Sequence, residues 1–155
     1  MNISFTVHGV PVPQGSKRAL VHRSTGRAVV IEQGGARHRD WRADIKAAAS
    51  DAMYVSAGNR HVMFPGPVGV SVCFTVPKPK SAPKTRRTWP GKRPDLDKLV
   101  RAVLDAITGE VIADDAQVVT LYCGKVYPGD AMGGLESLDQ PGCSVKVWQV
   151  EACNG

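Results

Sequence analysis

Residues 93–119 constrain the fold more than any other part of the chain. Their apolar side chains recur at i, i+3, i+4, i+7, i+8 and i+11, which is the pattern of one helical face. These residues are Leu96, Leu99, Val100, Val103, Leu104 and Ile107. Pro94 disfavours helical geometry in the residue before it, and Thr108-Gly109 is a suitable helix end. The sequence therefore predicts a helix that begins at or just after Asp95 and buries this face.

The same stretch carries two acidic pairs, Asp95 with Asp97 and Asp114 with Asp115. If the helix begins between Asp95 and Asp97, both carboxylates can point to one place, where a helix N-terminus favours negative charge by about 0.3 to 1 kcal/mol. Two carboxylates about 4 Å apart repel by roughly 4 kcal/mol at an effective dielectric near 20, so a cluster of them needs a cation or a proton. Hard oxygen ligands without convergent Cys or His favour Mg²⁺ or Mn²⁺ over zinc.

The charged residues of this stretch allow two interpretations of the acidic pairs. Asp97, Arg101 and Asp105 follow one another at intervals of four residues, so opposite charges stand next to each other. The acidic pairs can bind a metal ion. Alternatively, the first pair only caps the helix and the second only forms a turn, which is the interpretation that spacing alone favours.

The segments DLDKLVRAVLDAITG and EVIADDAQVV, followed by a basic strand, resemble the RusA family of Holliday junction resolvases, common in phage and prophage genomes. The family motif is an Asp-x-Asp that opens a helix, a Lys four residues after the second Asp, and an Asp-Asp-Ala-Gln stretch leading into a strand. The close match covers residues 93–127. A looser match includes GVPVPQGSKR and the helix around Trp41. Both motifs at this separation are specific, whereas either alone is weak.

The resemblance implies a catalytic Mg²⁺, for which Mn²⁺ can substitute. The implied metal ligands are Asp95, Asp97 and Asp115, with Asp114 adjacent in a supporting position. Arg101 stands where the family has its functional Lys, and Lys98 where it commonly has Asn. Arginine can stabilise a phosphate but does not give up its proton, so Lys98 is the alternative for a proton-transfer role.

The resemblance also implies an activity and a partner. It implies an endodeoxyribonuclease that resolves four-way DNA junctions by paired phosphodiester hydrolysis in recombination and repair, acting as a homodimer without a nucleotide cofactor. Two alternatives stay open: a non-catalytic basic DNA-binding accessory protein, and a metal-dependent nuclease for flaps or single strands.

Positive charge indicates a polyanionic partner. The formal net charge is +6, and residues 77–94 contain five Pro and seven Lys or Arg with no acid. This composition predicts a mobile basic loop beside the acidic residues, in which Trp89 either stacks on an unpaired base or packs on the domain. The predicted DNA contacts are Lys17, Arg18, Lys84, Arg86, Arg87, Lys92, Arg93 and Lys125. An ordinary solvated surface is the alternative for these residues.

The remaining patterns predict a single α/β (α+β) domain over residues 1–155, with a mixed sheet of about four or five strands and two or more helices. A strand is expected near residues 3–7, and a hairpin around Ser24-Thr25-Gly26 whose tip carries Arg23 and Arg27, with Lys17 and Arg18 in the loop before it. A helix is expected over residues 37–53 with Trp41 as a core anchor. The strand over residues 68–76 alternates apolar and small or polar residues, which predicts cover on one face only.

Cysteine spacing and hydropathy suggest the compartment. Cys73, Cys123, Cys143 and Cys153 form no C-x-x-C, so we expect reduced thiols and no zinc site. The four histidines show no ligand spacing and are interpreted as structural or surface residues, with His22 the one best placed to meet DNA. No stretch approaches the length of a membrane span, and the N-terminus lacks a leader pattern, so we expect a cytoplasmic protein without membrane contact.

Overall fold

The computed structural model describes residues 1–15, 17–21, 25–26, 28–32, 35–58, 60, 62–131 and 136–151. In chain order its elements are β1 (Asn2–His8), β2 (Lys17–Val21), β3 (Ala28–Glu32), α1 (Gly35–Ser56), β4 (Val68–Thr75), α2 (Leu96–Ile107), the 3-10 helix η1 (Asp115–Gln117), β5 (Val118–Val126) and β6 (Gly142–Gln149). The predicted α+β class is confirmed.

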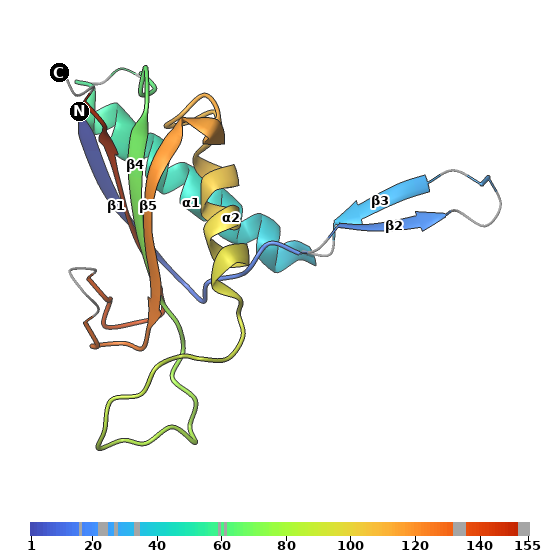
Figure 1. The fold of residues 1–155 in the computed structure, drawn as a ribbon, viewed down its shortest axis with the longest axis vertical. Coiled ribbons are helices and arrows are strands. Elements are labelled where there is room, and N and C mark those ends of the chain that lie inside the picture. The colour runs from blue at the N-terminus through green and yellow to red at the C-terminus, as the bar shows by residue number, and fades with distance from the viewer. Residues whose placement is uncertain are drawn as a thin grey trace.

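The main sheet has four strands in the order β1-β6-β4-β5. β6 pairs antiparallel with both β1 and β4, whereas β4 and β5 pair in parallel. Parallel neighbours need a crossover connection, and here α2 provides it between β4 and β5. Both helices cover the same face of the sheet (Figure 1). β5 is an edge strand because it is last in the strand order, and α2 lies next to it.

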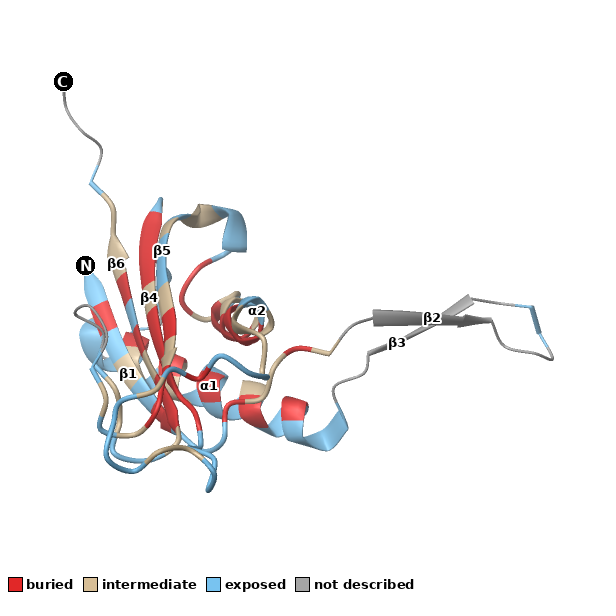
Figure 2. Ribbon diagram, turned by 60° about the horizontal axis from the view of Figure 1, so that its bottom comes forward, coloured by how far each residue is buried: buried red, intermediate tan, exposed pale blue. Residues whose placement is uncertain are grey.

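The core lies between this sheet and the two helices, and the ribbon coloured by burial shows buried residues on the strands and on both helices (Figure 2). The predicted helix over residues 96–107 is confirmed, and Leu99, Val103 and Ile107 are fully buried in it. Leu96 and Leu104, on the flank of the same stripe, are only partly buried. Because they face the edge strand, they are available to line a pocket.

Helix α1 extends the predicted helix by a few residues at each end and anchors the sheet through Trp41, which is 3% exposed. The buried stripe runs through Trp41, Ile45, Ala49 and Met53, and the neighbouring Ala48 and Ala52 are partly buried. Because the four residues of the stripe are spaced four apart, they form one ridge along the helix. The interpretation of Trp41 as a core anchor is therefore confirmed.

The expectation that β4 is covered on one face only is wrong. Its burial pattern leaves Ser71 as the single residue that is not fully buried. Trp148 lies directly over Gly69, and the backbone of Leu138 donates a hydrogen bond to Thr75 Oγ1 at 2.9 Å. Cover for the second face thus comes from segments more than sixty residues away, which strand periodicity cannot reveal.

Strands β2 and β3 form the predicted hairpin, a separate antiparallel pair that projects from the body of the domain (Figure 1). Lys17 and Arg18 lie in β2, paired with Glu32 and Ile31, so the expectation that they lie in a loop is wrong. The backbone pairing continues to the start of the strand and leaves no free loop there. Their side chains lie outside the described residues, as do His22, Arg23 and Arg27.

Two further expectations concern thiols and membranes. Cys73 and Cys143 are buried and Cys123 is partly buried, all as free thiols, while Cys153 lies outside the described residues. Burial raises the pKa of Cys73 to about 11 and, with the charge of Cys73 as a smaller cause, the pKa of Cys143 to about 12. In the described part of the chain, neither helix has the length and apolar character needed to cross a membrane.

Candidate active site

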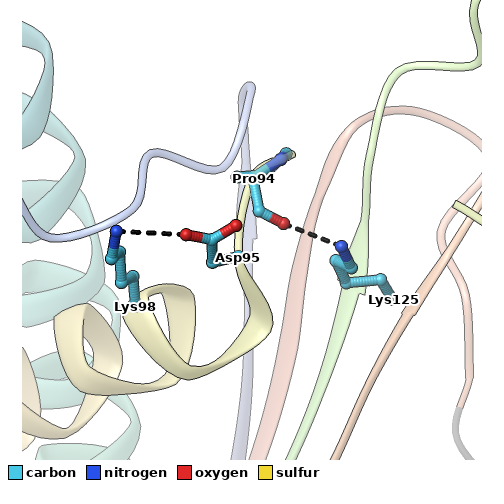
Figure 3. Close-up of polar contacts among 4 residues, drawn as sticks. All are labelled: Pro94, Asp95, Lys98 and Lys125. Atoms are coloured by element: carbon cyan, nitrogen blue, oxygen red, sulfur yellow. Dashed lines mark hydrogen bonds and ion pairs between the residues drawn. The ribbon is translucent and has the colours of Figure 1, made fainter. Parts of the chain in front are cut away.

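The start of α2 holds the first acidic pair. Asp95 is the N-cap residue in an extended conformation, but its side chain makes no capping hydrogen bond. Its carboxylate instead forms an ion pair with Lys98 at 3.0 Å between Oδ2 and Nζ (Figure 3). The hydrogen bond and charge of Lys98, with smaller effects of Arg93 and Lys125, lower the pKa of Asp95 below its ordinary value. Asp95 therefore remains a carboxylate at any pH near neutrality.

Lys125 fixes the position of this helix start from the edge strand. Its Nζ donates a hydrogen bond to the backbone oxygen of Pro94 at 2.7 Å (Figure 3). It donates another to the backbone oxygen of Lys92 at 2.9 Å. The residue pairs with Phe74 across β4 and β5, so its stem lies on the helix-covered side of the sheet. Lys125 was predicted to contact DNA, and that remains a prediction. In the structure its ammonium joins the basic segment, the start of α2 and β5.

A pocket of about 710 Å³ and another of about 610 Å³ lie on either side of the second acidic pair. The smaller one is formed by α2 and β5. Its lining is partly apolar and partly charged. The apolar residues are Leu96, Val100, Leu104, Leu121 and Cys123, and the charged ones are Asp97, Arg101, Asp105 and Asp115. The predicted row of alternating charges along α2 thus faces one pocket, together with one residue of the second acidic pair.

Asp114 has a different role. Its Oδ1 accepts a hydrogen bond from the backbone N–H of Ala116 at 2.8 Å, and the Gln117 side chain accepts from the N–H of Asp114 at 3.1 Å. This is a reciprocal capping box at the start of η1. Asp114 lines the larger pocket with Phe64 and other residues of the preceding loop. For Asp114 the alternative interpretation as a turn and cap residue describes the structure better than a metal ligand does.

The four predicted metal ligands are consequently not assembled into one cluster. Within the described residues, no three His, Cys, Asp or Glu side chains come together as a metal-binding group. Asp95 is turned to Lys98, and Asp114 is turned to its own backbone, whereas Asp97 and Asp115 line the same pocket and are both exposed. Mg²⁺ usually binds one or two protein carboxylates and completes its shell with water and substrate phosphate. Asp97 and Asp115 fit such an ion.

Sequence patterns did not single out Gln14, which binds Asp105, one of the residues that line this pocket. Its backbone N–H donates to Lys98 O at 3.0 Å, and its Nε2 donates to Asp105 Oδ2 at 2.7 Å. Gln14 is buried, and these two bonds fasten the segment before β2 along α2. The sequence feature that points to Gln14 is its place in the segment GVPVPQGSKR, which belongs to the looser part of the resemblance. The sequence places Asp105 on the charged face of α2, and the structure shows that it also lines this pocket.

Most of the predicted DNA-contacting residues lie on the surface of the basic segment 77–94. Lys84, Arg86, Arg87, Lys92 and Arg93 are exposed. The segment joins β4 to α2 and extends beyond the end of the sheet (Figure 1). The guanidinium of Arg87 lies 4.3 Å from the centre of the Trp89 ring and donates to the backbone oxygen of Ala131.

Trp89 is 58% exposed, so it does not pack into the domain core. One of the two predicted roles, packing on the domain, is therefore limited to this local contact with an arginine. An exposed aromatic ring beside several cations is a feature that sites for unpaired bases share.

The chain is similar to known proteins over most of its length. The sequence profile of the family described as Endodeoxyribonuclease RusA matches residues 9–135. The uncharacterized protein YqaN of Bacillus subtilis (strain 168) is 30% identical over 134 residues, which cover 81% of this chain and 87% of that protein. The matched range contains both acidic pairs, the basic segment, Gln14 and Lys125.

Proposed function

Because the chain belongs to the endodeoxyribonuclease RusA family, we propose that it is a Mg²⁺-dependent nuclease that resolves four-way DNA junctions in recombination and repair. The observation that supports this most strongly is the pocket between α2 and β5, which Asp97, Arg101 and Asp115 all line. We further propose that the protein acts as a homodimer in the cytoplasm. A two-fold dimer presents two such pockets to two strands of a symmetric junction.

Asp97 and Asp115 are the proposed ligands of the divalent ion. When bound, the ion supplies an activated water and neutralises charge on the scissile phosphate, with Mn²⁺ able to substitute. The two carboxylates come from the first turn of α2 and from η1, so their relative position depends on the fold and not on local sequence. The exposed side of the pocket leaves room for phosphate and water.

Asp95 joins this site, in our proposal, by turning away from Lys98 when DNA and the ion are present. The ion pair is half-exposed, with 44% and 39% of the two side chains accessible, and exposed pairs contribute little stability, so the exchange is inexpensive. The ammonium of Lys98, which this exchange frees, belongs to the first turn of α2, the turn that also carries Asp97. It can stabilise the phosphate or transfer a proton to the leaving oxygen.

Arg101 has the complementary role. It is exposed and lines the pocket one helical turn after Asp97, and its guanidinium keeps its charge at all relevant pH values. A guanidinium can donate two parallel hydrogen bonds to phosphate oxygens, which stabilises charge that develops during hydrolysis. Proton transfer is assigned to Lys98 and charge stabilisation to Arg101.

The competing function is a non-catalytic basic DNA-binding protein. Two observations favour it: the capping role of Asp114 and the ion pair of Asp95. The test is incubation of the purified protein with a labelled immobile four-way junction, a fork carrying a flap, and a linear duplex, each with Mg²⁺ and with EDTA. The proposal predicts Mg²⁺-dependent paired nicks in the junction. Band shifts without nicks would support the binding module, and preferential cutting of the fork would support the flap nuclease.

A further inference from the structure

A third pocket, of about 330 Å³, lies between α1 and α2, next to the candidate active site. It is lined by Arg39, Arg42, Ala43, Lys46, Asp105, Ala106 and Thr108. Its basic side chains come from α1, where positions 39, 42 and 46 are spaced by three and four residues and so share one helical face. Asp105 lines this pocket and the active-site pocket, so the two adjoin along one side of α2.

Some charged side chains of this third pocket have a protein partner and others have no ion pair among the described residues. Lys46 forms an ion pair with Glu110 at 3.0 Å. Asp105 accepts the hydrogen bond from Gln14. Among the described residues, neither Arg39 nor Arg42 takes part in an ion pair. Two guanidinium groups therefore face a small hollow without a protein anion of their own.

The chemistry of the lining selects an oxyanion. Guanidinium groups bind phosphate oxygens through paired hydrogen bonds and have a weaker hydration shell than an ammonium, which lowers the cost of entering a hollow. The pocket, of about 330 Å³, has room for a phosphate group. The small side chain of Ala43 leaves that space open.

We propose that this pocket, through Arg39 and Arg42, binds a backbone phosphodiester of the DNA substrate close to the scissile linkage. The inference rests on the proposed function, because a bound strand in the active-site pocket is what brings a neighbouring phosphate to the shared wall at Asp105. The contact fixes the register of the strand across α2, and it adds affinity that depends on salt but not on base sequence.

The test is a map of phosphate contacts in the absence of cleavage. Junction binding is measured by fluorescence anisotropy in EDTA for substrates in which one linkage at a time carries a neutral methylphosphonate. For the parent protein we expect weaker binding when a particular linkage near the cleavage site is neutralised. For Arg39→Gln/Arg42→Gln that linkage should lose its effect, and the slope of log affinity against log salt should fall by about 0.9, which is the contribution of one neutralised phosphate.

Two further variants separate contact from general charge. Arg37→Gln removes a cation from the exposed first turn of the same helix, outside the pocket lining, and should leave the methylphosphonate map unchanged. Ala43→Leu keeps every charge and fills the hollow, so it should abolish the effect of the same linkage. A parent-like map in the double variant, or in Ala43→Leu, overturns the pocket as a phosphate site.

Failure of this inference and failure of the proposed function give different results. If the parent nicks the junction with Mg²⁺ while the double variant keeps the parent's map, only the inference fails. If the parent binds and shows the predicted map but never nicks, only the proposed function fails. If the parent binds no DNA, both are overturned.

Discussion

Replacing Lys125 with Met tests whether this residue fixes the start of α2 or contacts DNA. Met keeps most of the aliphatic stem and removes the ammonium that donates to the backbone oxygens of Pro94 and Lys92. The bond to Pro94 is partly buried and the bond to Lys92 is exposed, so water can replace only the second one readily.

The expected cost follows from this difference. A hydrogen bond to a charged group contributes about 1.5 to 3 kcal/mol, and the partly buried bond to Pro94 should account for most of that. We therefore expect Lys125→Met to lower the free energy of unfolding by about 2 kcal/mol. For a domain of this size, the corresponding fall in Tm is about 4 to 8 °C.

Urea unfolding followed by circular dichroism measures this change, with Lys92→Met as a charge-matched control. The side chain of Lys92 is exposed, and it is its backbone oxygen that accepts the bond, so this control should change the free energy of unfolding by less than about 0.5 kcal/mol. The anchoring role is refuted if Lys125→Met is as stable as the control while the salt slope of DNA binding falls by about 0.9, which is the signature of a phosphate contact.

Two other predictions concern packing and titration. Gly142→Ala should destabilise the fold by about 1 to 3 kcal/mol, because a Cβ there would lie 2.3 Å from the backbone oxygen of Val7. Gly91→Ala, where a Cβ meets open space, should be neutral within about 0.5 kcal/mol in the same urea experiment, and equal effects would contradict the argument. In Lys98→Gln, the pKa of Asp95 should rise toward its ordinary value of about 3.9, as followed by carboxyl NMR. Since the folded-state pKa of Asp95 is lowered in the parent, its contribution to stability is present above about pH 4 and disappears as the pH falls through the lowered pKa. If Asp95 titrates at the same pH in Lys98→Gln as in the parent, Lys98 is not the cause of the lowered pKa.

The sequence predicts those features of this protein that depend on local patterns. The apolar stripe identifies α2 and its buried face, and the intervals of four residues place Asp97, Arg101 and Asp105 on one side, where they line one pocket. The capping box at Asp114 was also readable, because Gln117 stands three residues later.

The features that the sequence did not reveal depend on contacts between distant segments. Cover on the second face of β4 comes from Trp148 and Leu138, and the clamp on α2 comes from Gln14 near the N-terminus. The Asp95 side chain can either cap the start of α2 or pair with Lys98. These two arrangements differ too little in free energy for a sequence pattern to predict which one forms. Such choices are settled by the surrounding fold and by what binds to it.

The central claim is that Asp97 and Asp115 bind the divalent ion. Electron paramagnetic resonance titration of Mn²⁺ in the presence of saturating four-way junction tests it most directly, because it needs no turnover. We expect a saturable site in the parent and in Asp114→Asn, since asparagine still caps η1, and a loss of affinity of at least about tenfold in Asp97→Asn and in Asp115→Asn. Equal Mn²⁺ binding by the parent and the two pocket variants, or a loss confined to Asp114→Asn, would contradict the account.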